Sequence, residues 1–256
     1  MSPLFDDPWF YLASIPAVML YGIAKGGFGG AISILSVPMM ALVMPPTQAA
    51  AILLPILVVM DAFVVKTYWG VFDRVALWYL LPGALLGIFI GYVSAGAMNE
   101  HYMRVLIGAL ALGFGAQQLL GWQTRASGEH SRVAGGLLGA LAGFTSFSIH
   151  AGGPPFTMYL QPKQLSPLLF AGTAGIFFAV VNTTKLVPYY ALGQFTADNL
   201  VYSLALVPLA PLGVKIGHEL VKRSGATFYY QVISVCLLVI GAKLLWEGLA
   251  ALAAGP

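Results

Sequence analysis

The chain has 256 residues, of which 59% are hydrophobic and only 8% are Asp, Glu, Lys or Arg. Soluble domains average about 25% charged residues, so this composition excludes a soluble globular protein and predicts a polytopic membrane protein that contacts lipid. The formal net charge is +3 and no basic run of the kind that binds a nucleic-acid backbone is present, so we expect no nucleic-acid partner. A single cysteine, Cys236, excludes a disulfide framework and a cysteine-rich metal site.

The apolar residues fall into ten segments along the chain. They cover 9–24, 30–44, 46–66, 76–97, 102–121, 134–148, 152–161, 167–190, 198–221 and 227–252. Six of these segments are long enough to cross a hydrocarbon layer of about 30 Å as helices. The other four are short and form two pairs, 9–24 with 30–44 and 134–148 with 152–161, each interrupted by glycines. We therefore predict six transmembrane helices and two broken hairpins in a single transmembrane domain, 1–256.

The order of segments occurs twice, and short sequence matches accompany it. Phe28-Gly29-Gly30 corresponds to Ala151-Gly152-Gly153 about 123 residues later. Further matches at a similar spacing are Gly70-Val71-Phe72-Asp73 with Gly193-Gln194-Phe195-Thr196, and Pro82, Gly87 and Gly91 with Pro208, Gly213 and Gly217. We infer two homologous repeats, 9–122 and 134–252, joined by a polar linker, 123–133.

The basic residues between the segments orient the two repeats. The loops that carry them contain Lys66 and Arg74, Arg125 and Arg132, Lys163, and Lys222 and Arg223. Lys and Arg favour the cytoplasmic side, and these loops all lie there only if each hairpin enters and leaves by the same face. Each repeat then crosses the membrane three times, and an odd number inverts the second repeat relative to the first. The predicted fold is therefore all-α, with two inverted repeats that each contain a re-entrant or U-shaped broken helix hairpin and three transmembrane helices.

The first hairpin breaks at a lysine followed by glycines. Lys25 precedes Gly26, Gly27, Gly29 and Gly30 within an apolar stretch. Glycines at bilayer depth end a helix and free backbone amides, which only protein or a polar cavity can satisfy. A lysine at the membrane centre costs about 2.5 to 3.5 kcal/mol on insertion scales, so we expect an anionic substrate to compensate Lys25. The alternative is that Lys25 extends to the outer surface, as lysines near helix ends do.

The second hairpin breaks where polar side chains and prolines meet. Its polar and glycine residues are Thr145, Ser146, Ser148, His150, Gly152 and Gly153, followed by Pro154 and Pro155. Prolines cannot donate backbone hydrogen bonds, so a helix break is expected here. If this tip faces the one that carries Lys25, the two form a donor-rich cage for a small oxyanion. The alternative is that His150 only caps a broken helix.

Two ionisable residues are candidates for proton coupling. Histidine as a residue type titrates near neutral pH, which makes His150 one candidate, and Asp61, the other, lies in the inner part of its predicted helix. Asp61 is otherwise explained as the partner of Lys66 near the end of the same helix. Lys185, near the outer end of its segment, is expected to extend to the membrane surface.

Other patterns have structural explanations. Lys243 and Glu247, four residues apart, are predicted to form a local ion pair. Glycines at four-residue spacing are expected to let helices pack closely; they are Gly83, Gly87 and Gly91, and Gly135, Gly139 and Gly143. Aromatic residues near the segment ends fit an interfacial belt; they are Trp9, Tyr11, Tyr68, Trp69, Trp78, Tyr189 and Tyr190.

Enzyme chemistry is not indicated. Gly143-Phe144-Thr145-Ser146-Phe147 lacks the Gly-x-Ser-x-Gly pattern of a nucleophile elbow, and Lys25 does not stand in a phosphate-binding loop. With no metal-ligand cluster or paired carboxylates, we expect no cofactor and no ATP-driven step. Movement of a substrate would then be driven by a gradient or would be passive.

The glycine-rich breaks carry a family resemblance. Lys25-Gly26-Gly27-Phe28-Gly29-Gly30 followed by Val37-Pro38, the echo at Gly152-Gly153-Pro154, and the doubled four-segment layout resemble the sulfite exporter TauE/SafE family, also called TSUP. The resemblance covers essentially the whole chain. It implies a bacterial or archaeal inner-membrane permease for small sulfur-containing anions such as sulfite, thiosulfate or organosulfonates. Phe28, between two glycine pairs, departs from the usual glycine triplet.

We therefore expect a secondary transporter of a small anion, with Lys25 and the nearby glycine amides on one side of its site and Ser148 and His150 on the other. Lysine suits a sulfur oxyanion because its compact charge carries three donors. The alternatives are a passive anion channel and a non-transporting membrane scaffold. The sequence predicts neither the direction of transport nor an oligomeric state.

Overall fold

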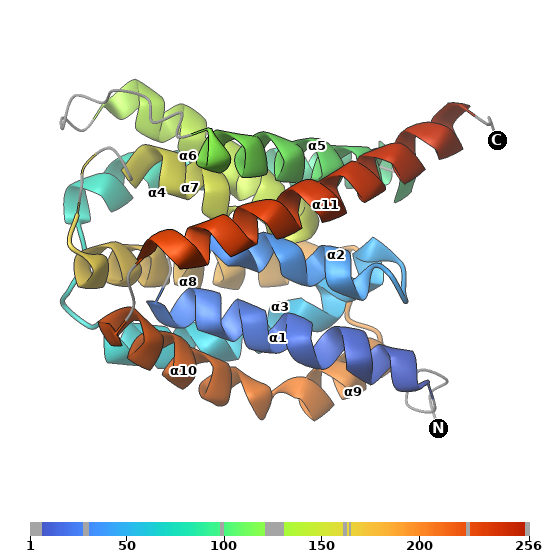
Figure 1. Cartoon of the computed structure of the whole chain (residues 1–256), viewed down its shortest axis with the longest axis horizontal. Helices are drawn as coiled ribbons and strands as arrows, with labels where there is room; N and C mark the ends of the chain where they lie inside the picture. The colour runs from blue at the N-terminus through green and yellow to red at the C-terminus, as the bar shows by residue number, and fades with distance from the viewer. Residues whose placement is uncertain are drawn as a thin grey trace.

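The computed structural model describes residues 7–27, 31–97, 100–120, 131–160, 163, 165–223 and 226–253, which form helices joined by turns without any strand (Figure 1). In the first half of the chain the helices are α1 (Pro8–Gly27), η2 (Ala31–Leu35), α2 (Ser36–Met40), α3 (Pro46–Thr67), α4 (Arg74–Ser94), η3 (Ala95–Ala97) and α5 (Glu100–Leu119). In the second half they are α6 (Arg132–Ile149), α7 (Gly153–Leu160), α8 (Pro167–Ala191), α9 (Ala197–Leu206), α10 (Leu209–Arg223) and α11 (Ala226–Ala253). The prediction of an all-helical chain is confirmed.

The first residue of each of the ten predicted segments lies within two residues of the first residue of a helix. Local signals explain these starts. Pro46 and Pro167 occupy the first position of α3 and α8, where the missing N–H of proline would have no partner within the helix in any case. Asp73 caps α4 and Thr196 caps α9, each through a side-chain oxygen that accepts from a backbone N–H of the first turn.

One predicted segment is not a single helix. The sequence predicts a continuous span over 198–221, but the structure divides it into α9 and α10, which meet at an angle of 44°. The division falls at Val207 and Pro208. Proline cannot donate the backbone hydrogen bond that a continuous helix needs, and its ring displaces the preceding turn.

Four helices in the described part of the chain are long and apolar enough to cross a membrane, namely α3, α4, α6 and α8, and the bent pair α9 and α10 would make a fifth. The sequence placed α6 in a short hairpin arm, 134–148. The helix is longer than that arm, and its 18 residues extend about 27 Å at 1.5 Å per residue, which is close to the hydrocarbon thickness. The predicted count of six spans stays a prediction.

In the described part of the chain, glycines bring three pairs of helices into backbone contact, namely α1 with α10, α4 with α6 and α5 with α11. A Cβ atom added at Gly26 would overlap the carbonyl oxygen of Val214, and one added at Gly87 would overlap that of Ala140. Any side chain at these positions would push the helices apart. The expected role of the regularly spaced glycines in close packing is therefore confirmed for Gly83, Gly87, Gly139 and Gly143.

The helices lie side by side along the long axis of the molecule, and the start of α1 and the end of α11 are at the same end (Figure 1). α3 and α8 contact each other, and each also contacts α1 and α6. Most of the central part of α3 is buried. Polar side chains of both helices are buried, among them Asp61 of α3 and Asn182 and Lys185 of α8.

Candidate functional site

A hydrogen bond links the two interrupted helices, α1 and α6, at a junction near the C-terminal end of α6. α6 stops at Ile149, and His150 caps it in the left-handed conformation with φ 55°. Its N–H donates to the carbonyl of Ser146 at 3.1 Å, so the expected break and the capping role of His150 are both confirmed. Tyr21 of α1 donates its hydroxyl to the carbonyl of His150 at 3.1 Å, which joins α1 to the residue that caps α6.

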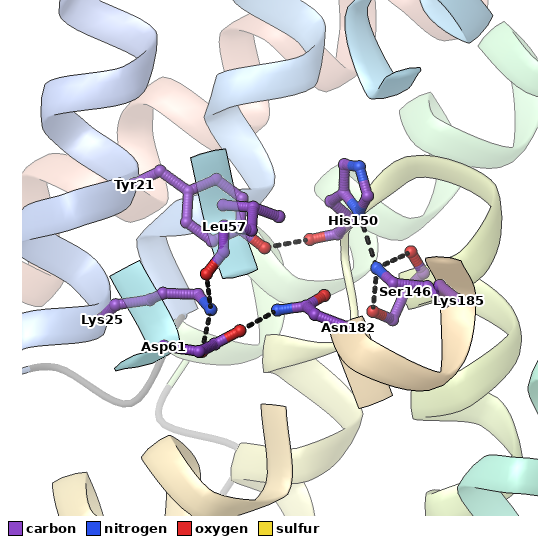
Figure 2. A network of polar contacts seen from close by, with 8 residues as sticks. All are labelled: Tyr21, Lys25, Leu57, Asp61, Ser146, His150, Asn182 and Lys185. Atoms are coloured by element: carbon purple, nitrogen blue, oxygen red, sulfur yellow. Dashed lines mark hydrogen bonds and ion pairs between the residues drawn. The ribbon is translucent and has the colours of Figure 1, made fainter. Parts of the chain in front are cut away.

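The first polar group at this junction contains a buried ion pair. Lys25 Nζ contacts Asp61 Oδ1 and also donates to the carbonyl of Leu57 on α3 at 3.4 Å. The other carboxylate oxygen of Asp61 accepts from Asn182 Nδ2 of α8 at 2.7 Å (Figure 2). The side-chain oxygen of Asn182 has no hydrogen-bond partner in the described part of the chain.

This geometry corrects two interpretations of the sequence. Lys25 is only 6% exposed, so it does not extend to the surface, and the charge that compensates it in the structure is that of Asp61. Asp61 is 4% exposed and pairs with Lys25, not with Lys66. The physical reason is that a buried carboxylate and a buried ammonium each need an opposite charge, and the contact between α1 and α3 supplies it.

The second polar group is centred on Lys185 of α8. Its Nζ donates to the carbonyl and the hydroxyl of Ser146, at 2.9 and 3.0 Å, and lies 2.7 Å from Nδ1 of His150 (Figure 2). With the lysine as donor, Nδ1 is the acceptor, and the remaining Nε2–H of His150 donates to the carbonyl of Ala50 at 2.9 Å. The imidazole therefore links α3 to α8.

Lys185 was expected to extend to the membrane surface, and this expectation is wrong. Its side chain is 0% exposed. It stands six residues before the last residue of α8, on the face that packs into the protein, and the open end of α6 provides three acceptors. None of its partners in the described part of the chain is a carboxylate.

The other predicted site residues have mixed placements. The Thr145 hydroxyl lies 2.8 Å from the carbonyl of Leu141 in its own helix and 3.0 Å from the carbonyl of Ala151 beyond the break, whereas Ser148 donates to the carbonyl of Phe144 within its helix at 3.0 Å. Gly26 and Gly27 form the end of α1, and Gly152 and Gly153 form the start of the next helical segment. Gly29 and Gly30 lie outside the described residues.

Two tyrosines fasten the ends of the interrupted helices. Tyr68 donates to the carbonyl of Gly26 at 2.6 Å, and Tyr189 donates to the carbonyl of Phe147 at 2.6 Å. The sequence predicts both in the interfacial belt, but both are buried, and the two carbonyls satisfy their hydroxyls there. The rest of that set is exposed, as expected, namely Trp9, Tyr11, Trp69, Trp78 and Tyr190.

Among the residues that the structure describes, the junction thus contains two buried lysines and one buried carboxylate. Sequence reasoning missed Lys185, Asn182 and Tyr21 as members of this cluster. A signal for the first two was present, because Asn182 and Lys185 are polar residues three apart in an apolar helix and so share one of its faces. Intramembrane polar residues usually face the protein interior.

The chain matches the family model described as Sulfite exporter TauE/SafE over residues 14–244, which include every residue of the cluster. No curated protein and no solved structure matches the chain.

Proposed function

Because the chain belongs to the sulfite exporter TauE/SafE family and is therefore a multi-pass membrane transporter rather than an enzyme, we propose that it is a secondary transporter of a small sulfur-containing anion. Sulfite, thiosulfate and small organosulfonates are the substrates proposed. The observation that carries this proposal is the excess positive charge of the buried cluster, in which Lys25 and Lys185 outnumber Asp61. A buried ammonium without a carboxylate is costly until an anion binds beside it.

Burial of the cluster favours a carrier over a passive channel. Lys25 is 6% exposed and Lys185 is 0% exposed, so an anion reaches either lysine only after the helices around them move. A channel needs a continuous path past its charges. A carrier needs a closed site that opens to one face at a time.

We also propose that the two halves are inverted repeats that exchange roles during transport. Several paired features support this. α3 and α8 both begin with proline, and the turns that follow them contain Gly70 and Gly193, both at positive φ. The first helix of each half packs against a later helix of the other half, α1 against α10 and α6 against α4. Such exchanged pairing suits a movement of one half against the other.

Proton coupling is proposed to pass through Asp61. The carboxylate of Asp61 pairs with Lys25, so a substrate anion must compete with Asp61 for this lysine. Protonation of Asp61 removes its charge and leaves Lys25 able to bind the anion. Anion binding then tightens as pH falls, by up to about tenfold per pH unit. The charged and titratable groups near this carboxylate are Lys25 and Tyr21 of α1, Lys185 of α8 and, beyond Lys185, His150, which is the second candidate carrier.

The coupling proposal is tested by comparing Asp61→Asn with His150→Gln in proteoliposomes. Asp61→Asn should keep exchange of labelled for unlabelled anion but lose the dependence of affinity on pH and lose uptake driven by a pH gradient. If His150→Gln alone has these effects, the proton passes through His150. If both variants keep the wild-type pH dependence, neither residue carries the proton.

The transport proposal is tested by uptake of radiolabelled sulfite, thiosulfate and a small sulfonate into proteoliposomes. The wild type should take up at least one of them saturably. Lys25→Met should reduce that uptake by about 10- to 100-fold, the worth of a charged hydrogen bond, whereas Lys243→Met, at a lysine that is 54% exposed, should leave it unchanged. No saturable uptake of any of the three anions by the wild type would overturn the proposal.

A further inference from the structure

A cavity of about 70 Å³ lies beside the second polar group. It is formed where α4 and α8 end and where α3 begins, and its walls include Thr47 and Gln194 near the protein surface and Ser148, Ala50 and Tyr189 further in. One water needs only about 10 to 15 Å³ of such space, so the cavity has room for several waters or a small hydrated ion. The cavity lies at the start of α3, whereas the basic loop with Lys66 and Arg74 follows the other end of that helix.

The inner wall of this cavity leads directly to Lys185. Ala50, in the wall, accepts a hydrogen bond from Nε2 of His150 at 2.9 Å. Tyr189, also in the wall, stacks its ring on the imidazole of His150, with centroids 6.1 Å apart and planes inclined by 23°. Nδ1 of the same imidazole lies 2.7 Å from Lys185 Nζ. One aromatic layer, Tyr189 with His150, therefore separates the cavity from the lysine.

The two buried lysines differ in the charge of the groups that they contact. Lys25 is neutralised by Asp61, whereas Lys185 is surrounded by the neutral acceptors of Ser146 and His150. The field of Lys185 is therefore not cancelled by a direct partner, and it acts through a low-dielectric medium into the cavity. The cavity has a surplus positive charge at its inner end and only neutral side chains among those that line it.

We propose that this cavity is the entrance vestibule for the transported anion, that Lys185 is the substrate-binding residue at its inner end, and that Tyr189 is the gate between them. The inference rests on the proposed transport function and adds to it a residue and a route. Tyr189 follows Lys185 by one helical turn, so both side chains lie on the same face of α8. The Tyr189 hydroxyl donates to the carbonyl of Phe147 at 2.6 Å, and the ring also packs against the rings of Phe147, His150 and Phe195.

The vestibule is tested by cysteine labelling, because the chain has only one cysteine and Cys236→Ser removes it. Ser148→Cys then marks the inner vestibule and Gln194→Cys marks its outer part. The probes are an anionic and a cationic methanethiosulfonate of similar size, with rates expressed relative to free cysteine. We expect the anionic reagent to react about tenfold faster than the cationic one at Ser148→Cys, as expected for a focused field.

Removal and replacement of the charge give the decisive comparison. In Lys185→Met the preference for the anionic reagent should disappear, and in Lys185→Arg it should remain. Methanesulfonate, which does not react with the reagents, should protect Ser148→Cys only when residue 185 is charged. Labelling at Gln194→Cys is the control for access of the reagents to the outer vestibule, and elution as a single symmetric peak in gel filtration shows that each variant is folded. A preference that is unchanged in Lys185→Met, or no reaction at Ser148→Cys while Gln194→Cys reacts, would overturn the vestibule.

The gate is tested with a cysteine behind the tyrosine ring. Ser146→Cys should react slowly in the Cys236→Ser background and at least about tenfold faster when combined with Tyr189→Ala. Tyr190→Ala, at the exposed neighbouring residue, is the matched control and should change nothing. Equal rates with and without the Tyr189 ring would overturn the gate. None of these measurements needs transport, so they separate failure of the vestibule from failure of the sulfur-anion assignment.

Discussion

The two halves of the molecule each bury a lysine at the same junction, and they treat it differently. Lys25 is on α1, a helix that ends at the break, and it pairs with the carboxylate of Asp61. Lys185 is on α8, a helix that continues past the break, and it donates to Ser146 and His150. A paired charge and an unpaired one have different uses, since only the unpaired charge attracts an anion without first losing a partner.

The origin of the difference lies at one pair of positions. Asp61 follows Pro46 by 15 residues, and Asn182 follows Pro167 by 15 residues, so the two side chains have the same register in α3 and α8. They contact each other, with Asn182 Nδ2 donating to Asp61 Oδ2 at 2.7 Å. Two carboxylates here would repel, and two amides would leave Lys25 unpaired. The sequence difference between the halves therefore makes one lysine neutralised and the other free to bind.

The largest loss of stability is expected from Lys25→Met. It leaves Asp61 buried without an opposite charge, and breaking a buried ion pair in this way costs about 3 to 5 kcal/mol. Thermal unfolding in detergent should show this loss. The double variant Lys25→Met/Asp61→Asn should recover most of the stability but not the uptake. Equal stability of the single variant and the wild type would show that the pair is not buried as described.

A smaller loss is expected when the contacts between helices are disturbed. Gly26→Ala and Gly87→Ala each add a Cβ that overlaps a carbonyl of the facing helix, and overpacking of this kind costs about 1 to 3 kcal/mol. Similar losses from the two variants would agree with equivalent pairing of α1 with α10 and of α6 with α4. Gly136→Ala is the control, since its Cβ would meet nothing within 4 Å. Unfolding temperatures distinguish these outcomes.

Lys185→Met should change stability by only about 1 kcal/mol, because the three hydrogen bonds it loses are offset by removal of an unpaired buried charge. Its uptake should nevertheless fall by about 10- to 100-fold. This contrast with Lys25→Met, where stability falls as well, separates a binding charge from a paired one. A large loss of stability in Lys185→Met would mean that its role is structural.

The smallest effect is expected at the exposed pair predicted from the sequence and present in the structure. Lys243 Nζ lies 3.7 Å from Glu247 Oε1, with both side chains substantially exposed. Removing such a pair costs at most about 0.5 kcal/mol. Lys243→Met should therefore unfold and transport as the wild type does, and a larger effect in either assay would give this helix an unforeseen role.

Helix positions were predictable from the sequence because their signals are local. Pro46 and Pro167 start helices, His150 and Gly152 stand at a break, and long apolar runs separate them. Partners were not predictable, because they depend on how distant helices pack. Asp61 has Lys66 five residues away, which suggested a local pair, but helix contact brings Lys25 to it from 36 residues away. The prediction for Lys185 used only its distance from the end of α8. The face of the helix on which the side chain lies decides whether it reaches the membrane surface, and that face is buried.

The central claim is that the buried lysines bind the transported anion. The most direct measurement is exchange of radiolabelled thiosulfate for unlabelled thiosulfate across proteoliposomes, with the wild type, Lys185→Met and Lys25→Met/Asp61→Asn. The account predicts saturable exchange in the wild type that is reduced at least about tenfold in both variants. Saturable exchange that survives unchanged in both folded variants would contradict it.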